Sequence, residues 1–368
     1  MNQRAYLDYA STAPLRPQAL SAMQEALSVT AADPARLHAE GLRSRHSLEA
    51  ARDEIADFLG ARNREVVLTS GTSESAATVA RAFSGKMQVV SAVEHPSVLK
   101  SVEAAGPHSV VGVDHDGILR LDELSSLLSG DAVVVHVQLG NQETGVVQPI
   151  AEVAEMCHSR GVRLHVDAAQ AAGHVQIEFD HIGLDFLSLS AHKLGGPAGV
   201  GALLVRRGVR IPALVLGGFQ ERARRAGFEN LPGAVGFAAA CSAIDIKAES
   251  GEQEALTDRL RSGMSRIPGL TMFTPDRGAL PHILCVGSAD VEPQAVLMDL
   301  DRAGVAAHSG AACASEDLEP SPVLAAMGRD AHHSLRFSVG WASRPEDVER
   351  CIEAVANSLS RLRELARQ

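Results

Sequence analysis

The chain has 368 residues, of which 45% are hydrophobic, and its formal net charge is -11. The length exceeds that of a single typical core, so we expect two domains, and the hydrophobic content is sufficient to fill both. Nucleic acids and anionic membranes are recognised by clustered Lys and Arg, so the acidic charge argues against both partners and favours small-molecule chemistry.

Leader, membrane and metal signals are missing from the sequence. No apolar leader precedes the first motif, and no segment has the roughly 18 uninterrupted apolar residues of a spanning helix, so we expect a cytoplasmic protein. The five cysteines form no C-x-x-C pair, which argues against a disulfide framework and a zinc site. The histidines lack metal-ligand spacing, and we therefore predict no metal.

Short apolar runs alternate with helical stretches along the first two thirds of the chain. Strands are predicted at 66–70, 88–92, 133–138, 162–166, 186–189 and 200–205. This alternation predicts an α/β fold with a mostly parallel sheet that is covered on both faces. Ligands of such sheets bind at the carboxyl ends of the strands. The polar residues that follow predicted strands, and are expected at one cleft, are Thr72, His95, Asn141, Gln142, Glu143, Asp167 and Lys193.

The pattern changes from about residue 247 onward. Strands predicted at 269–273, 282–286 and 334–338 alternate with helices, which indicates a smaller α+β domain. Ser343 and Glu346 have the spacing of a capping box, which predicts where the final helix begins.

The segment Ser70-Gly71-Thr72-Ser73 lies between a predicted strand and a helical run that begins at Glu74. Backbone N–H groups at a helix N-terminus suit a phosphate. A simple Ser/Thr cap is the commoner explanation of an isolated segment of this kind, and the missing G-K-[S/T] argues against a nucleotide P-loop. Gly71 and Thr72 are nevertheless candidate phosphate ligands, with Ser190 and His192 completing the cup.

An acid and a lysine end two successive predicted strands, at Asp167 and Lys193. An enzyme that holds pyridoxal phosphate needs this pair, because the lysine forms the Schiff base and the acid contacts the pyridine nitrogen. Gln170 would then donate to the phenolic oxygen of the ring. The ordinary alternatives are an Asp that caps a turn and a surface lysine. Small and polar neighbours such as Ser190 and His192 crowd Lys193 and favour the reactive role.

His95 and Cys313 are the remaining candidates for catalysis. His95 precedes a proline and would stack on the cofactor ring and move protons, although a loop histidine is more often a surface residue. The segment 307–317 around Cys313 lacks bulky apolar residues, so this thiol cannot anchor in a core and is placed to react. The other cysteines lie in apolar patterns and are expected to be buried: Cys157, Cys241, Cys285 and Cys351.

Together, these segments resemble the cysteine desulfurases of the class V aminotransferase group, which are fold type I pyridoxal-phosphate enzymes. The resemblance covers essentially the whole chain, and the S-G-x-x-C loop followed by L-E-P-S is similar to the NifS/IscS-like branch. The matching segments include Tyr6–Pro14, Thr69–Ser75, Glu94–His95, Gly140–Gly145, Asp167–Gln170, Ser190–Lys193, Ser309–Cys313 and Leu335–Ser338.

The resemblance implies a seven-stranded large domain at 14–246 and a small domain at 1–13 and 247–368 that carries the cysteine loop. It implies that Lys193 holds pyridoxal phosphate and removes the α-proton of L-cysteine, and that Arg336 binds the substrate carboxylate through a bidentate contact. Cys313 would take the sulfur as a persulfide and release alanine. The expected partners are a second copy of the chain and a sulfur acceptor, in iron–sulfur cluster assembly or tRNA thiolation.

Two positions depart from the family pattern. Gln142 replaces the second Asn of an N-N-E segment and keeps the same hydrogen-bonding groups on a longer arm, so a cofactor or substrate contact would have altered geometry. Phe228 stands where the family usually has a Thr that reaches the neighbouring subunit's cofactor phosphate. Two alternatives stay open: a relative acting on selenocysteine or cysteine sulfinate, and a sulfur-relay scaffold with weakened cofactor binding.

Overall fold

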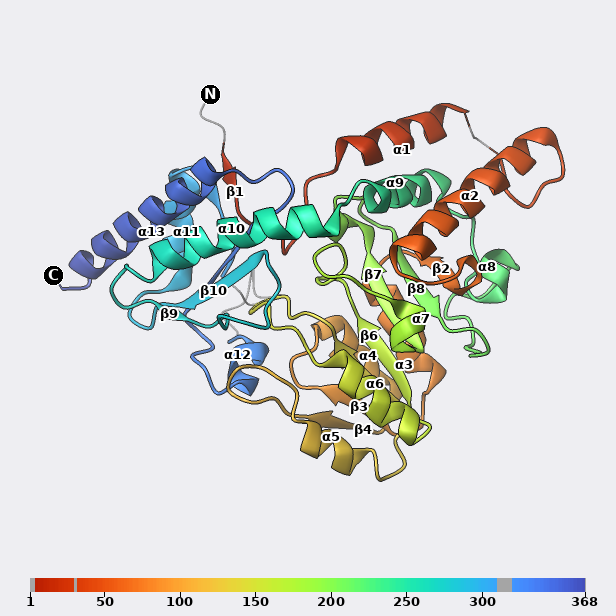
Figure 1. The fold of residues 1–368 in the computed structure, drawn as a ribbon, viewed down its shortest axis with the longest axis horizontal. Helices are drawn as coiled ribbons and strands as arrows, with labels where there is room; N and C mark the ends of the chain where they lie inside the picture. Colours follow the sequence, from red (N-terminus) through yellow and green to blue (C-terminus); the bar gives the residue numbers. More distant parts are fainter. Residues whose placement is uncertain (1–3, 30–31, 310–319, 368) are drawn as a thin grey trace.

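The computed structural model describes residues 4–29, 32–309 and 320–367. Figure 1 shows two units side by side, a large sheet covered by helices and a smaller unit that contains both ends of the chain. The long helix α10 (Ile246–Met264) runs from one unit to the other.

The large unit is built on a seven-stranded sheet with the strand order β2-β8-β7-β6-β5-β3-β4. Only β8 runs antiparallel to its neighbours, so the sheet is mostly parallel, as predicted. Its strands are β2 (Val66–Thr69), β3 (Gln88–Ser91), β4 (His108–Val111), β5 (Val134–Gln138), β6 (Arg163–Asp167), β7 (Phe186–Ser190) and β8 (Gly201–Val205). The sequence pattern missed β4, because this edge strand exposes His108 and Val110 and has no continuous apolar run.

Helices cover both faces of this sheet. One face packs against α2 (Ala39–Phe58), α5 (Leu121–Leu127), α6 (Ile150–Ser159) and α9 (Leu231–Ser242) in a single large core. The other face packs against α3 (Thr72–Ala82) and α4 (Pro96–Ala105). Successive side chains alternate between the faces, so Gln138, Asp167 and Ser190, which end three neighbouring strands, all lie on the α3/α4 face. The carboxyl ends of the strands therefore carry polar groups on one side of the sheet.

The small unit has its own sheet and core. β10 (Ile283–Gly287) pairs antiparallel with both β9 (Thr271–Met272) and β12 (Ser334–Ser338). Its core draws on residues 5–7 and 256–359, whereas the large core draws on 48–241. The two cores support the division into 14–246 and 1–13 with 247–368, which stays a prediction. The helices that pack with or near this sheet are α10, α11 (Pro293–Arg302), α12 (Pro322–Ala326) and α13 (Pro345–Leu365).

The N-terminal segment is part of the small unit. β1 (Ala5–Tyr6) pairs in parallel with β11 (Val305–Ala306), and Asp8 forms a further bridge with Ser338 of β12. Residues 8–12 consequently run beside the last strand of the chain before they enter the large unit.

The final helix begins later than the capping-box spacing predicts. α13 begins at Pro345, and the Asp347 carboxylate accepts a hydrogen bond from the Arg344 N–H at 3.1 Å. The Ser343 hydroxyl instead accepts from the Gly340 N–H at 3.0 Å and closes the preceding turn. The prediction that Ser343 and Glu346 form the capping box was therefore wrong.

One segment at the surface of the large unit has an unusual backbone. Within α8 (Gln220–Ala223), Glu221, Arg222 and Ala223 all have positive φ, at 47°, 57° and 62°. Such angles cost energy in residues with a side chain. A buried pair opposes this cost, because the Arg52 guanidinium donates to both Glu221 carboxylate oxygens at 2.6 and 3.0 Å. The turn is thereby fixed to α2.

The remaining elements are α1 (Pro17–Val29), α7 (Phe179–Ile182), η1 (Asn63–Glu65) and η2 (Ala191–Leu194). In the part of the chain that the structure describes, no single helix has both the length and the apolar character to cross a membrane. Only α9 and α10 together, at 74° to each other, satisfy both criteria.

Candidate active site

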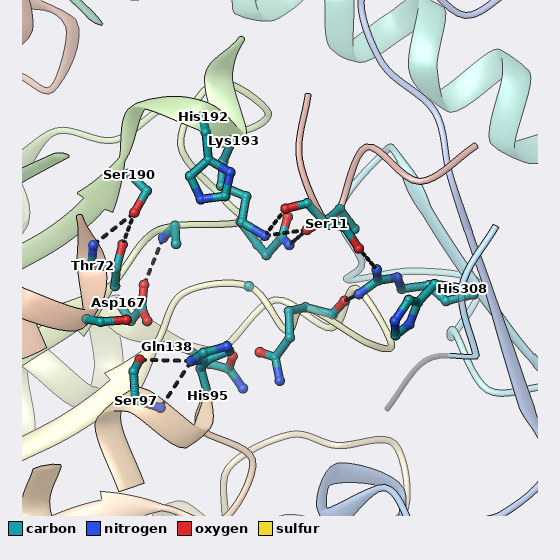
Figure 2. Close-up of a pocket in the computed structure, with 17 residues that line it drawn as sticks. Ser11, Thr72, His95, Ser97, Gln138, Asp167, Ser190, His192, Lys193 and His308 are labelled. Carbon is teal, nitrogen blue, oxygen red and sulfur yellow. Dashed lines mark hydrogen bonds between the residues drawn. The ribbon is translucent and has the colours of Figure 1, made fainter. Parts of the chain in front are cut away.

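A cavity of ≈ 290 Å³ lies where the carboxyl ends of β5, β6 and β7 meet the small unit, and Figure 2 shows its lining. It brings together most of the residues that the sequence indicated: Thr72, His95, Gln142, Asp167, Gln170, Ser190, His192, Lys193 and Arg336. Gly71 precedes Thr72 but does not itself line the cavity. Cys313 lies outside the described residues.

One end of the cavity is formed by the start of α3. The Ser190 hydroxyl oxygen accepts from the Thr72 N–H at 2.8 Å and forms a second hydrogen bond with the Thr72 hydroxyl at 2.9 Å. Gly71 has a φ of 146°, and a Cβ there would lie 3.1 Å from the Ser190 oxygen, so the approach of these two segments requires glycine. The start of a helix with two adjacent hydroxyl groups can hold a phosphate.

The Asp167 carboxyl group forms the floor of the cavity. Asp167 ends β6 and is only 5% exposed, and it accepts from the Ala169 N–H at 2.9 Å. Burial raises its pKa to about 6, although the Ala169 N–H and the Lys193 charge oppose the rise. A carboxylate here would contact a cationic ring nitrogen, which would favour its charged form.

Lys193 extends its amine into the same cavity from η2. The Nζ donates to the carbonyl oxygens of Ala10 and Ser11, the second at 3.0 Å. Burial and the positive charge of Arg336 lower the pKa of this amine to about 8. About a tenth of this amine is therefore uncharged at pH 7, and the uncharged form is the one that imine formation requires. Gln170, which was expected to face the ring, donates its amide to the Ala10 carbonyl.

His95 is half-buried rather than a surface loop residue, because it caps α4. Its Nδ1 accepts from the Ser97 N–H at 3.1 Å and lies 2.8 Å from the Ser97 hydroxyl. A backbone N–H can only donate, so the proton of the neutral ring is on Nε2. Burial and the Lys193 charge lower the pKa of His95 to about 4. The pKa of His192 is also lowered to about 4 by burial and Lys193, and its Nδ1 lies 3.2 Å from the Thr12 hydroxyl.

The opposite end of the cavity contains Arg336, which is 2% exposed in β12. Its Nη1 donates to the Gln142 carbonyl at 2.8 Å, and its Nη2 donates to Asp8 at 2.9 Å and to Ser11 at 2.8 Å. Two buried donors, Arg336 Nε and Gln142 Nε2, have no hydrogen-bond partner among the described atoms. Such donors are costly when unpaired, and a ligand carboxylate would satisfy them.

Several lining residues were not assigned by sequence reasoning. Ser11 belongs to the N-terminal segment that carried the family resemblance, but its contact with Arg336 spans 325 positions and no local pattern signals it. Ser97 and Gln138 follow or end predicted strands and could have been found by that rule. His308 lies beside a strand of only two residues, which is too short to produce a pattern.

The comparisons with known proteins agree with this geometry. The model of the Aminotransferase class-V family matches residues 5–351. A cysteine desulfurase IscS from Dictyoglomus turgidum is 34% identical over 383 residues, covering 100% of this chain and 97% of that protein.

Two solved structures are also similar over nearly their full lengths. A NifS-like protein from Rickettsia africae has a TM-score of 0.91 at 26% identity, covering 97% of this chain and 100% of its own. SspA in complex with cysteine has a TM-score of 0.82 at 27% identity, with coverages of 91% and 99%. The chain therefore belongs to the class-V aminotransferase family and, within it, to the group of NifS/IscS-like cysteine desulfurases.

Proposed function

We propose that this protein is a pyridoxal-phosphate-dependent cysteine desulfurase that converts L-cysteine to L-alanine and passes the sulfur to an acceptor. The observation that carries the proposal is one cavity that contains a buried carboxyl group, an amine with a lowered pKa and a helix N-terminus. The relatives' names and the cysteine bound to SspA support L-cysteine as the substrate.

The residues present fit this cofactor. Gly71, Thr72, Ser190 and His192 would hold the phosphate, and Asp167 would contact the ring nitrogen. His95 would lie against the ring, and Gln170 would exchange its present contact with Ala10 for the phenolic oxygen. When bound, the cofactor would supply an electron sink for the electrons released at the substrate carbons.

The other roles belong to side chains of this chain alone. Lys193, with its lowered pKa, takes the α-proton of the substrate. The unpaired donors of Arg336 and Gln142 bind the substrate carboxylate, while Asp8 and Ser11 hold the guanidinium in place. Nη2 of Arg336 already donates to Asp8 and Ser11. A bidentate contact of the substrate carboxylate with Nη1 and Nη2 therefore requires that these hydrogen bonds rearrange. Cys313 receives the sulfur as a persulfide, a role proposed from the family resemblance.

The test is the reaction of the purified, cofactor-loaded protein with L-cysteine. We expect alanine and sulfide in equal amounts when a reductant is present. Cys313→Ser should keep the visible absorption of the bound cofactor but release no sulfide, whereas Cys351→Ala, which alters a thiol buried in the small unit, should remain active. Appreciable sulfide release by Cys313→Ser would refute the persulfide assignment. Faster turnover of selenocysteine or cysteine sulfinate would identify a related activity instead.

We propose that two copies of the chain form a homodimer. A groove of ≈ 690 Å³ opens between α1, α2 and α9, and its lining combines alanines, Leu42 and Val235 with polar side chains such as Arg43 and Glu54. Near the strained turn in α8, Phe219 is 91% and Phe228 is 67% exposed. Exposed apolar area of this kind marks an interface. Light scattering should give twice the chain mass of 38.7 kDa, and a monomer at micromolar concentration would contradict the proposal.

At such an interface Phe228 offers an apolar contact and no hydrogen-bond donor to a partner's phosphate. A protein that gains no visible absorption after the cofactor is added would indicate weakened cofactor binding. That result would favour the alternative of a sulfur-relay scaffold. We place the reaction in the cytoplasm, since Cys157, Cys241, Cys285 and Cys351 are all free thiols. The acceptor protein would be identified by transfer of labelled sulfur from the loaded enzyme.

A further inference from the structure

The segment that presents His95 to the cavity is a short connection, residues 92–95, between β3 and α4. The ladder between β3 and β5 ends with the pair Val90 and His136, so it does not extend to this connection. The hydrogen bond from the Ser97 N–H to the His95 ring is local and orients the ring with respect to α4. The place of His95 above the sheet therefore depends in part on side chains that tie the connection to β5.

Gln138 supplies this tie. It ends β5, is 2% exposed and lines the cavity together with His95, as Figure 2 shows. Its backbone N–H donates to Glu94 Oε1, and its side-chain Nε2 donates to the Val93 carbonyl oxygen. A carbonyl oxygen can only accept, which fixes the orientation of the Gln138 amide. One residue thus holds both residues that precede His95.

The Glu94 carboxyl group takes part in this tie as an uncharged acid. Burial raises its pKa well above the ordinary value, and the charge of Asp167 acts in the same direction, whereas the Gln138 N–H opposes the rise. Glu94 Oε2 has no hydrogen-bond partner among the described atoms, and an ionised carboxylate with so few donors would be costly to bury. The tie consequently adds no second negative charge beside Asp167.

Gln138 is also fixed with respect to Asp167. The two residues are opposed in the parallel ladder of β5 and β6, and the next N–H, that of Leu139, donates to the Asp167 carbonyl at 2.8 Å. In the proposed function, Asp167 contacts the nitrogen of the cofactor ring and His95 lies against the same ring. Gln138 therefore links the positions of two side chains that must meet one ring.

We propose that Gln138 is a positioning residue for the reaction, which holds His95 where it can lie against the ring that Asp167 contacts. This proposal rests on the proposed desulfurase function. Gln138 acts through His95, and proton transfer depends steeply on the geometry of the group that carries the proton. Loss of the tie should therefore lower kcat and leave KM nearly unchanged.

The first test is Gln138→Met, whose side chain is of similar length but cannot donate. The Val93 carbonyl keeps its hydrogen bond from Asn141 Nδ2 at 3.2 Å, so the variant leaves no buried acceptor unpaired. We expect kcat for L-cysteine to fall about tenfold, a part of the 10²–10⁴-fold that a general acid–base contributes, with KM within about twofold. Gln176→Met, at an exposed position of the same unit, is the control. An unchanged kcat in Gln138→Met would overturn the proposal.

A double-mutant comparison shows whether Gln138 acts through His95. His95→Asn keeps a side chain that can cap α4 but has no imidazole. In that background, Gln138→Met should cause no further loss of kcat, because the group that it positions is already gone. A loss of the same size in both backgrounds would show that Gln138 acts on the substrate or the cofactor directly, and would contradict the positioning role.

NMR titration of the full-length protein without cofactor gives a readout that does not depend on turnover. Burial and the Lys193 charge lower the pKa of His95 to about 4. In Gln138→Met the ring should be held less firmly in its buried position, so its pKa should rise towards 6.5, while the pKa of His174, also about 4, should not move. An unchanged His95 pKa would refute the tie. If the unmodified enzyme does not act on L-cysteine, the proposed function fails, and the titration still decides whether Gln138 holds His95.

Discussion

The two walls of the cavity differ in how completely their polar atoms are hydrogen-bonded. The cofactor wall, formed by Thr72, Asp167, Ser190 and Lys193, has a hydrogen-bond partner for each of these side chains. The substrate wall, formed by Gln142, His308 and Arg336, retains two buried donors without a partner among the described atoms. The first wall is organised before any ligand arrives, and the second is completed by its ligand.

The difference follows from where the residues come from in the chain. Most of the cofactor wall lies at the carboxyl ends of adjacent strands and at the start of α3, so the packing of the large unit fixes it, and only Lys193 also donates to the N-terminal segment, at Ala10 and Ser11. The substrate wall combines a loop after β5 with β12, and it depends on Asp8 and Ser11 from the other end of the chain. Substitutions on the first wall should change cofactor binding, and substitutions on the second should change substrate binding.

The largest expected effect is that of Lys193→Ala on the cofactor wall. Without the amine, both the visible absorption of the bound cofactor and the turnover of L-cysteine should be lost, the latter on the order of 10⁴-fold. Absorption spectra and sulfide assays measure the two effects, with Lys100→Ala, at an exposed position of α4, as the control. Survival of either property would contradict the role of Lys193.

Arg336→Ala tests the substrate wall. Removing the charged donors should raise KM for L-cysteine by about 100-fold, because a charge-assisted hydrogen bond contributes roughly 1.5–3 kcal/mol. The cofactor absorption should persist, since Arg336 does not belong to the other wall. Steady-state kinetics would be compared with Arg302→Ala, whose side chain is 70% exposed. Loss of the absorption with unchanged KM would show that the two walls are not separable.

The pH dependence of cofactor attachment should report the lowered pKa of Lys193. Only the uncharged amine attacks the cofactor aldehyde, so the rate should rise about tenfold between pH 6 and pH 7 and level off above the pKa of about 8. Stopped-flow absorption after mixing apoprotein with cofactor measures this rate. A rate that keeps rising up to pH 10 would indicate an ordinary lysine pKa.

Ser190→Ala should produce the smallest change. It removes the acceptor of the Thr72 N–H and one hydroxyl from the proposed phosphate site, and loss of about 1 kcal/mol corresponds to roughly a fivefold weaker cofactor affinity. KM for L-cysteine should be unaffected when the cofactor is saturating. Titration of the apoprotein would be compared with Ser159→Ala at an exposed position. A larger effect on KM than on cofactor affinity would show that Ser190 belongs to the substrate wall and would contradict its assignment to the cofactor wall.

Sequence reasoning located the cavity residues that lie next to a regular element. Asp167 and Lys193 follow buried strands whose apolar runs are visible in the sequence, so their meeting at one edge of the sheet was predictable. The role of Asp8 was not, because the contact that reveals it joins residues 328 positions apart. His308 was missed for a similar reason, since only its pairing with Arg336 brings it to the cavity. Arg336 itself was indicated only by family resemblance.

The passage of the N-terminal segment beside β12 has a consequence for synthesis of the protein. Asp8 and Ser11 leave the ribosome long before Arg336, their partner, which follows them by 328 and 325 positions. The sheet with Asp167 and Lys193 is complete much earlier and can fold during translation. The active site is therefore complete only after β12 has been made. A nascent chain that has folded the large sheet carries the cofactor residues but still lacks Arg336.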